Sequence, residues 1–161
     1  MEAIENVLKE RGLSLHEISA DGDCLYNAIA HQLSLMSKSS NDKISMSDIR
    51  SKAATYIRSH KDDFLPFLSS RDGEPISEFY FDEYCNLVER SCENGGEWGG
   101  EPELRALSSA LERSIIVIQP EGRLIKFGDE FSSKTPITIT FHRYAFNLGE
   151  HYNSTKPINR L

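Results

Sequence analysis

Cys24 stands directly behind a tight turn, at the first position of a pattern typical of a helix. The turn is made by Asp21, Gly22 and Asp23 in the stretch ISADGDCLYNAIAHQL. A helix N-terminus offers partial positive charge and unpaired N–H groups, which favour a thiolate and can stabilise an oxyanion on a carbonyl under attack. Gly22 lets the backbone come close to such a substrate. The pattern indicates either a nucleophilic cysteine or a cysteine that fills the first buried position of an amphipathic helix.

A thiol nucleophile needs a general base, and His151 is the best placed of the five histidines. It lies in the extended stretch EHYNS, where side chains two residues apart point to the same face, so His151 and Asn153 are expected to lie together. An asparagine oxygen can bind one imidazole nitrogen and leave the other for the sulfur, as in Cys/His/Asn proteases. The alternative for this stretch is an edge strand that carries polar residues.

The other four histidines suit the role of base less well. His31 lies about 10 Å further along the helix that starts at Cys24. His60 ends a polar helix, and His16 is expected on the polar face of a short strand. His142, at the close of a strand, is expected to be solvated.

Length and composition fit one compact domain over residues 1–161, with 39% hydrophobic and 27% charged residues. A chain of this length can form a core without disulfides or structural metal. The three cysteines are an odd number without a CxxC pair, which argues against a disulfide framework and a zinc ribbon. We expect no cofactor and no metal. Free thiols indicate a reducing compartment, so we expect the cytosol, with the nucleus as a second location.

The charge and hydropathy of the chain exclude two classes of partner. The net charge of −7 argues against nucleic acid, whose binding depends on clustered Lys and Arg, and it favours a basic partner. The longest apolar runs are shorter than the ~20 residues that a membrane helix needs, and the first residues do not resemble a signal peptide. We therefore expect no membrane partner.

Helical periodicity dominates the first two thirds of the chain. It predicts helices at 3–12, 24–36, 48–60, 61–68, 76–90 and 103–113. Ser47 is expected to cap the third of these, and Cys85 is expected to pack in the core of the fifth. The stretch SCENGGEWGGEP, with four glycines, is expected to be a loop.

Extended patterns then dominate the C-terminal third. Strands are predicted at 114–120, 123–127, 136–141 and 150–154, and an earlier one at 13–19. SIIVI is continuously apolar, which is typical of a central strand, whereas ITITF alternates. The expected class is α+β, with a small mixed or antiparallel sheet packed between helices.

Three stretches taken together, DGDCLYNAI, WGGEPEL and HYNS, resemble the OTU (ovarian tumour) family of cysteine proteases, which are deubiquitinases. They match the family's Asp-Gly-x-Cys turn, its Trp-Gly block and its His followed by an aromatic residue, in the family's order and over most of the chain. The resemblance implies a papain-like OTU fold and hydrolysis of isopeptide bonds at the last glycine of ubiquitin. It also implies ubiquitin and polyubiquitin chains as partners.

The resemblance assigns a role to each residue of the turn and of the HYNS stretch. Cys24 would be the nucleophile, His151 the base and Asn153 the group that orients it. Asp21 is counted in the family's catalytic site, either to support the turn or to set the charge state. The N–H groups of Gly22, Asp23 and Cys24 are the oxyanion candidates, and the Asp23 carboxylate is expected to cap the helix.

The glycine-rich loop leaves two interpretations open. Trp98 either supports the catalytic loops or forms a wall of the groove for the ubiquitin tail. Gly95, Gly96, Gly99 and Gly100 are expected to form a flexible strip along which the glycine-ended tail lies. The glutamates of this region either attract the arginines of that tail or form a solvated acidic loop.

Two other functions remain open at the level of sequence: a non-catalytic ubiquitin-binding module, and a protease for another ubiquitin-like modifier. The pattern also resembles the branch of OTU proteins that carry the protease at the C-terminus, behind a helical extension, and are linked to ribosomes and translation. Ribosome-associated substrates are therefore among the expected partners. The same resemblance implies that this chain would be the catalytic domain of a longer protein, while the sequence leaves open whether Met1 is the natural start.

Overall fold

The computed structural model describes residues 2–37, 43–70, 73–143 and 150–158. Its helices are α1 (Glu2–Glu10), α2 (Cys24–Met36), α3 (Met46–Ser59), α4 (Lys61–Phe64), α5 (Phe81–Glu89) and α6 (Glu101–Leu111). Its strands are β1 (Leu13–His16), β2 (Ile115–Ile118), β3 (Leu124–Phe127), β4 (Ile137–His142) and β5 (His151–Pro157). Short 3-10 turns lie at η1 (Leu65–Phe67), η2 (Glu78–Tyr80), η3 (Cys92–Asn94) and η4 (Asp129–Phe131).

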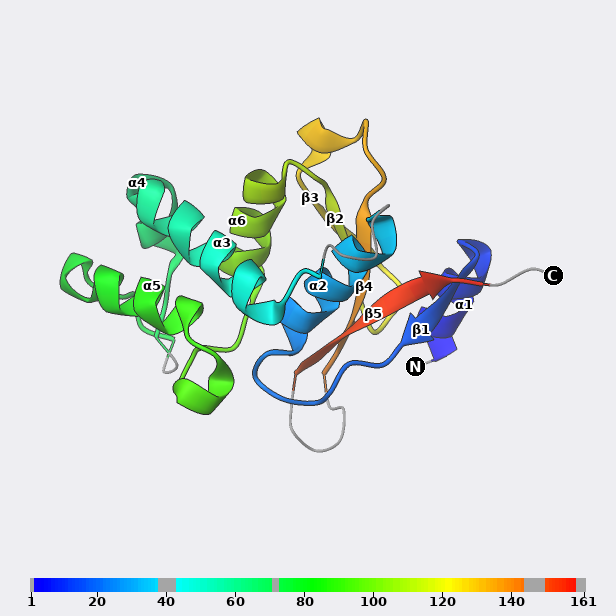
Figure 1. Cartoon of the computed structure of the whole chain (residues 1–161), viewed down its shortest axis with the longest axis horizontal. Helices are drawn as coiled ribbons and strands as arrows, with labels where there is room; N and C mark the ends of the chain where they lie inside the picture. Colours follow the sequence, from blue (N-terminus) through cyan, green and yellow to red (C-terminus); the bar gives the residue numbers. More distant parts are fainter. Residues whose placement is uncertain (1, 38–42, 71–72, 144–149, 159–161) are drawn as a thin grey trace.

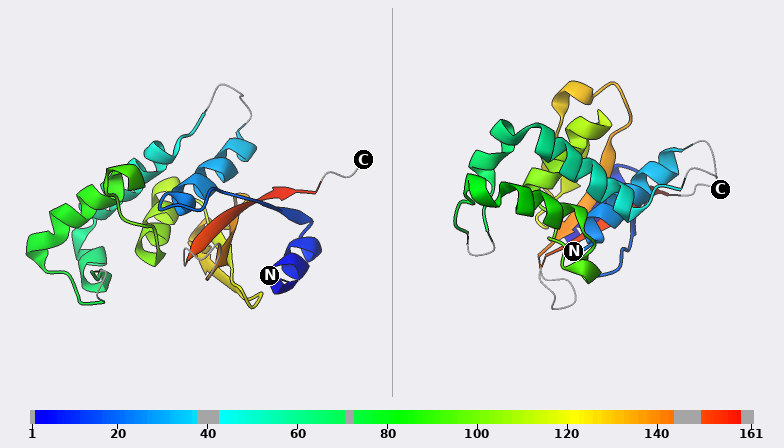
Figure 2. Two further views of the ribbon diagram at one scale, coloured as in Figure 1. Left: turned by 90° about the horizontal axis from the view of Figure 1, so that it is seen from below. Right: turned by 60° about the vertical axis from the view of Figure 1, so that its left-hand side comes forward.

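The five strands form one mixed sheet in the order β1-β5-β4-β2-β3, in which β2 and β4 are parallel and the other neighbours antiparallel. Helix α2 packs on β5 and β4, α3 packs on α2, and α5 and α6 pack on α3 (Figure 1). Helix α1 lies on the other side of β5 (Figure 2), where Ile4 and Leu8 pack against Ile118. The expected α+β class, with a mixed sheet between helices, is confirmed.

The largest apolar cluster holds α2 against the sheet. Leu25 and Ile29 from α2 and Val117 and Ile139 from the sheet all belong to it, and each is at most 2% exposed. Because α2 begins at Cys24, this packing fixes the start of the helix relative to β5. A second cluster joins α3 to α5 and contains Cys85, fully buried as predicted.

Four helices begin at other residues than the sequence predicts: α1 and α6 begin one and two residues earlier, and α3 and α5 differ for reasons that the structure shows. Helix α3 is capped by Ser45, not Ser47, because Ser45 and Asp48 form a reciprocal pair of side-chain-to-backbone hydrogen bonds. Helix α5 begins at Phe81, not at Ile76. The N–H of Ile76 donates to the carbonyl of Leu68, which holds this segment in an extended conformation.

Strand β5 is an interior strand that pairs with β1 on one side and β4 on the other, so the edge-strand alternative is wrong.

Strand β2 is buried along its whole length, as predicted. The alternation in ITITF does not mark an exposed face, because Thr138 and Thr140 are buried. The polar groups there are satisfied internally: the Thr138 carbonyl accepts from the Thr155 hydroxyl, and its N–H donates to Gln32. Within the described ranges, no helix is both long and apolar enough to span a bilayer.

Candidate active site

The turn before Cys24 is held by Asp21. The Oδ1 atom of Asp21 accepts from the N–H of Asp23 at 2.9 Å, and its carbonyl accepts from the N–H of Cys24 at 3.3 Å. An aspartate that binds the backbone two residues on is a common way to shape a turn. Both N–H groups have an acceptor in Asp21, but the bond from Cys24 is the longer and weaker one. The N–H of Cys24 is therefore a better oxyanion candidate than that of Asp23, and the N–H of Gly22 stays the other candidate.

The expectation that Asp23 caps α2 is wrong. It occupies the N-cap position with φ −98° and ψ 4°, not the usual extended conformation, and its side chain makes no capping hydrogen bond. The carboxylate instead accepts from Arg50 Nε at 2.9 Å and from the N–H and Sγ of Cys92 at 3.0 and 3.1 Å. Burial tends to raise the pKa of Asp23, but the bonds from Cys92 and Arg50 outweigh burial and lower it.

Arg50 joins the nucleophile turn to two helices. This α3 residue is fully buried, and its Nη2 lies 2.7 Å from Asp23 Oδ1 and donates to the carbonyl of Gly22 at 3.1 Å. Its Nη1 donates to the carbonyl of Val88 at 2.8 Å, and its guanidinium lies 4.2 Å from the ring centre of Tyr26. This residue was not among those predicted from the sequence. The available signal was an arginine on the apolar face of a helix, where a charge needs a buried partner.

Cys24 lies against β5 and is only 3% exposed. The N–H of Tyr152 donates to its Sγ at 3.5 Å, and Figure 1 shows the starts of α2 and β5 side by side. Burial raises the pKa of Cys24, and the N–H groups of Tyr152 and Leu25 oppose this shift only in part. The N–H groups at the helix start thus favour the thiolate, as expected, but burial outweighs them, and a base must remove the proton.

His151 and Asn153 lie on one face of β5, as the two-residue period predicts. His151 Nε2 lies 2.8 Å from Asn153 Oδ1, and both side chains are buried. Asn153 Oδ1 also accepts from the N–H of Ile18 at 2.8 Å. Since the backbone N–H of Tyr152, between these two residues, donates to the sulfur, Cys24 lies against the segment of β5 that carries both side chains.

Two of the other histidines form a pair away from these three residues. The rings of His16 and His31 stack at 3.6 Å, and His31 Nδ1 lies 2.6 Å from Ser154 Oγ. His60 stacks on Tyr56. None of these contacts involves Cys24.

The expectation that His142 is solvated is wrong. Strands β4 and β5 pair so that His142 lies opposite His151, with 6.3 Å between ring centres. Its Nε2 lies 2.8 Å from Thr140 Oγ1 and 3.3 Å from Asn153 Nδ2. Burial, and secondly the charge of His151, lower the pKa of His142 to about 4.

Trp98 packs on the nucleophile turn and stays 42% exposed. A Cβ atom on Gly22 would lie 2.9 Å from Trp98 Nε1 and 2.7 Å from Cys92 Cβ, so this position requires glycine. Both interpretations of Trp98 fit this placement, because the Nε1 edge of the indole packs on the turn while the side chain remains partly exposed.

The glycines after Cys92 are packed at two positions, which contradicts the expected flexible strip. A Cβ on Gly96 would lie 1.8 Å from the carbonyl oxygen of Arg90, and one on Gly99 would lie 2.3 Å from Leu25 Cδ2. The N–H of Gly100 donates to Glu103 Oε1 at 2.9 Å. Burial raises the pKa of Glu103 to about 7.

Among the described residues, Asp21, Asp23 and Cys92 have the spacing of metal ligands, with one atom from each within 4.8 Å of the others. The Asp23 carboxylate is already bound by the guanidinium of Arg50. A metal cation would have to displace or tolerate this positive charge, so the group is poorly suited to hold one.

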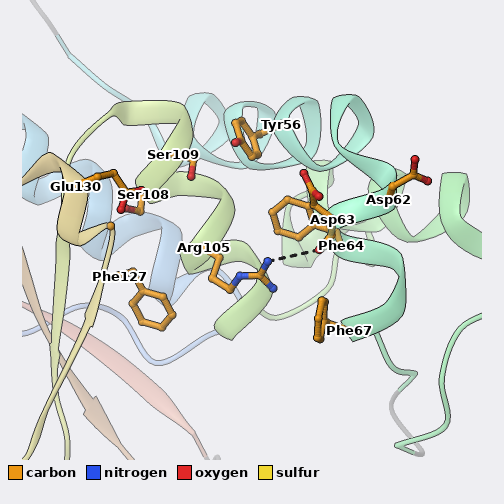
Figure 3. A pocket seen from close by; sticks show the side chains of 11 residues that line it. Tyr56, Asp62, Asp63, Phe64, Phe67, Arg105, Ser108, Ser109, Phe127 and Glu130 are labelled. Carbon is orange, nitrogen blue, oxygen red and sulfur yellow. Dashed lines mark hydrogen bonds between the residues drawn. The ribbon is translucent and has the colours of Figure 1, made fainter.

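A pocket of about 470 Å³ lies between α4, α6 and η4. Its centre is Arg105, whose guanidinium lies 4.9 Å from the ring centre of Phe64 and 5.3 Å from that of Phe67 (Figure 3). The described residues that line it include none of the predicted site residues. This pocket is therefore separate from the candidate active site.

The pattern of the OTU-like cysteine protease family matches residues 19–152, which include Cys24 and the start of β5. This chain belongs to that family. It is 40% identical over 157 residues to deubiquitinase OTUD6B of Xenopus tropicalis, covering 97% of this chain and 50% of that protein. Human OTUD6B is 38% identical over 160 residues, with 98% and 52% covered. Ubiquitin thioesterase otu2 of Schizosaccharomyces pombe is 35% identical over 152 residues, with 92% and 47% covered.

This OTU chain spans about half the length of the curated relatives that it matches. Solved structures support the same fold. The OTUD1 OTU domain superposes with a TM-score of 0.68 at 23% identity, covering 96% of this chain and 93% of that one. An OTU domain in complex with ubiquitin superposes with a TM-score of 0.59 at 23% identity, with 89% and 69% covered.

Proposed function

We propose that this OTU domain is a deubiquitinase, which hydrolyses isopeptide bonds at the C-terminal glycine of ubiquitin. The observation that carries the proposal is the placement of Cys24 against the strand on which His151 binds Asn153 at 2.8 Å. Relatives named deubiquitinase and ubiquitin thioesterase support ubiquitin as the substrate, as do OTU structures bound to ubiquitin.

The two ring nitrogens of His151 have different roles in this proposal. Asn153 Oδ1 binds Nε2, so Nδ1 is the nitrogen that takes the thiol proton of Cys24. This transfer is needed because burial raises the pKa of the thiol. The imidazolium that forms is stabilised by the asparagine oxygen, which accepts its Nε2–H.

The reaction then follows the order of a thiol protease. The sulfur of Cys24 attacks the glycine carbonyl carbon, and the N–H groups of Cys24 and Gly22 stabilise the oxyanion. The C–N bond breaks, and His151 donates its proton to the leaving lysine amine. Water, deprotonated by His151, hydrolyses the thioester and restores the thiol.

Ubiquitin that carries an electrophile at its C-terminus tests the proposal directly. We expect a covalent adduct, which peptide mapping by mass spectrometry should locate on Cys24. Reversible binding without an adduct would instead indicate a ubiquitin-binding module. Reaction only with another modifier would indicate a protease of that modifier.

Asn153→Ala is expected to lower kcat by roughly 100-fold with little change in KM, because the lost bond stabilises the imidazolium and does not contact ubiquitin. Steady-state cleavage of a fluorogenic ubiquitin amide measures both constants. Asp21→Ala is the comparison: it should lower kcat and the melting temperature together, since Asp21 holds the turn. Full activity of Asn153→Ala, with a kcat defect in a stable Asp21→Ala, would assign the orienting role to Asp21.

The location and wider partners of the protein are part of the same proposal. Cys24, Cys85 and Cys92 are all free thiols, which suits the cytosol or the nucleus. Ribosome-associated substrates are proposed from the resemblance to the branch linked to translation. Co-sedimentation of the full protein with ribosomes would test this association.

A further inference from the structure

The Asn153 side chain is held at both ends of its amide. Its Oδ1 accepts from the N–H of Ile18 at 2.8 Å and lies 2.8 Å from His151 Nε2. Its Nδ2 lies 3.3 Å from His142 Nε2, on the neighbouring strand. Three residues from three segments therefore meet at one amide group.

The chemistry of these groups fixes the direction of each bond. A backbone N–H only donates, so the atom that faces Ile18 must be the amide oxygen. The NH₂ group then faces His142, and since an amide nitrogen only donates, His142 Nε2 must accept. An accepting Nε2 means that His142 is neutral and carries its proton on Nδ1. The Thr140 hydroxyl lies 2.8 Å from the same Nε2 and 3.5 Å from the backbone carbonyl of Asn153. With a bare Nε2 the hydroxyl donates across the shorter distance and shares the lone pair with the Asn153 amide.

We propose that His142 is a positioning residue for the deubiquitinase reaction, which orients the Asn153 amide so that its oxygen faces His151. The inference rests on the proposed function, because its kinetic effect is read in that reaction. In this role His142 acts through Asn153 and takes no part itself in the making or breaking of bonds. His142 keeps the amide from rotating its NH₂ group toward His151. An amide NH₂ group cannot accept a hydrogen bond from the imidazolium.

The neutrality that this role requires agrees with the surroundings of His142. Burial and the neighbouring charge of His151 lower the pKa of His142 to about 4. His142 is therefore neutral, and an acceptor, near neutral pH.

Kinetics of two substitutions test the role. His142→Leu removes the acceptor and should lower kcat about tenfold with unchanged KM, the size expected for one lost hydrogen bond. His142→Gln offers a side-chain oxygen and should recover most of this loss. Equal losses in the two variants would overturn the proposal. His31→Leu is the matched control, since His31 also binds a β5 side chain, Ser154, and should keep kcat near the wild-type value.

A double-mutant cycle separates positioning from a general structural effect. If His142 acts through Asn153, His142→Leu should cause no further loss of kcat in an Asn153→Ala background. Losses that multiply would overturn the proposal.

The tautomer of His142 in the wild-type protein gives a test that needs no variant. Nitrogen NMR at neutral pH should show a protonated Nδ1 and a bare Nε2, and a protonated Nε2 would overturn the proposal even if the variants do not fold. Absence of an adduct with the ubiquitin electrophile would instead count against the proposed function, so the two failures are distinguishable.

Discussion

Cys24→Ala is expected to abolish cleavage of diubiquitin while the domain keeps its fold. Loss of the sulfur removes the nucleophile, for which losses on the order of a millionfold in kcat have been measured in a serine protease. The cost in folding free energy should be small, about 1 kcal/mol, because alanine also fits a buried position at a helix start. Gel-based cleavage and thermal melting of the purified variant measure the two effects.

The other two cysteines serve as controls for this prediction. Cys85 is fully buried between α3 and α5, so Cys85→Ala should lower the melting temperature and keep turnover. Cys92→Ser keeps a donor for Asp23 and should also remain active. Cleavage by a purified Cys24→Ala protein would end the proposal that Cys24 is the nucleophile.

Arg50→Met is expected to cost about 3–5 kcal/mol of unfolding free energy, the range for removal of one partner of a buried ion pair. The substitution leaves the Asp23 carboxylate buried without its guanidinium, and it also removes the donor to the Gly22 carbonyl. Urea unfolding measures the loss. Adding Asp23→Asn should recover part of it, because the remaining buried group is then neutral.

Arg58→Ala is the matched control on the same helix. Arg58 pairs with Glu89 at 2.9 Å, but both side chains are partly exposed, so its loss should cost at most about 1 kcal/mol. A loss of similar size in Arg50→Met would show that the buried pair with Asp23 contributes little.

The effect of Arg50 should also depend on pH in a defined direction. Since the pKa of Asp23 is lowered in the folded state, its contribution to stability is complete above the unfolded pKa of about 4 and is lost as pH falls through the folded pKa. The difference in unfolding free energy between wild type and Arg50→Met should therefore narrow in acid. A difference that stays constant down to pH 3 would argue against the ion pair as its cause.

Local backbone geometry was enough to place the main catalytic candidates from sequence. The helical period predicted α2 with its bounds Cys24–Met36, because apolar side chains three and four residues apart must share a face. The two-residue period of a strand placed His151 beside Asn153. The order of three short motifs was sufficient for the family, since each motif spans only neighbouring residues.

Contacts between distant segments were decided by the tertiary structure. Arg50 binds Asp23 across 27 positions, and the register of β4 with β5 places His142 beside Asn153. The same packing buries Cys24, which reverses the direction of its expected pKa shift. Periodicity predicts which face of an element is apolar, but not which residues of other elements contact a polar group on that face. Those contacts form only when the elements pack, and they decide the hydrogen-bond partners and the desolvation of the polar group.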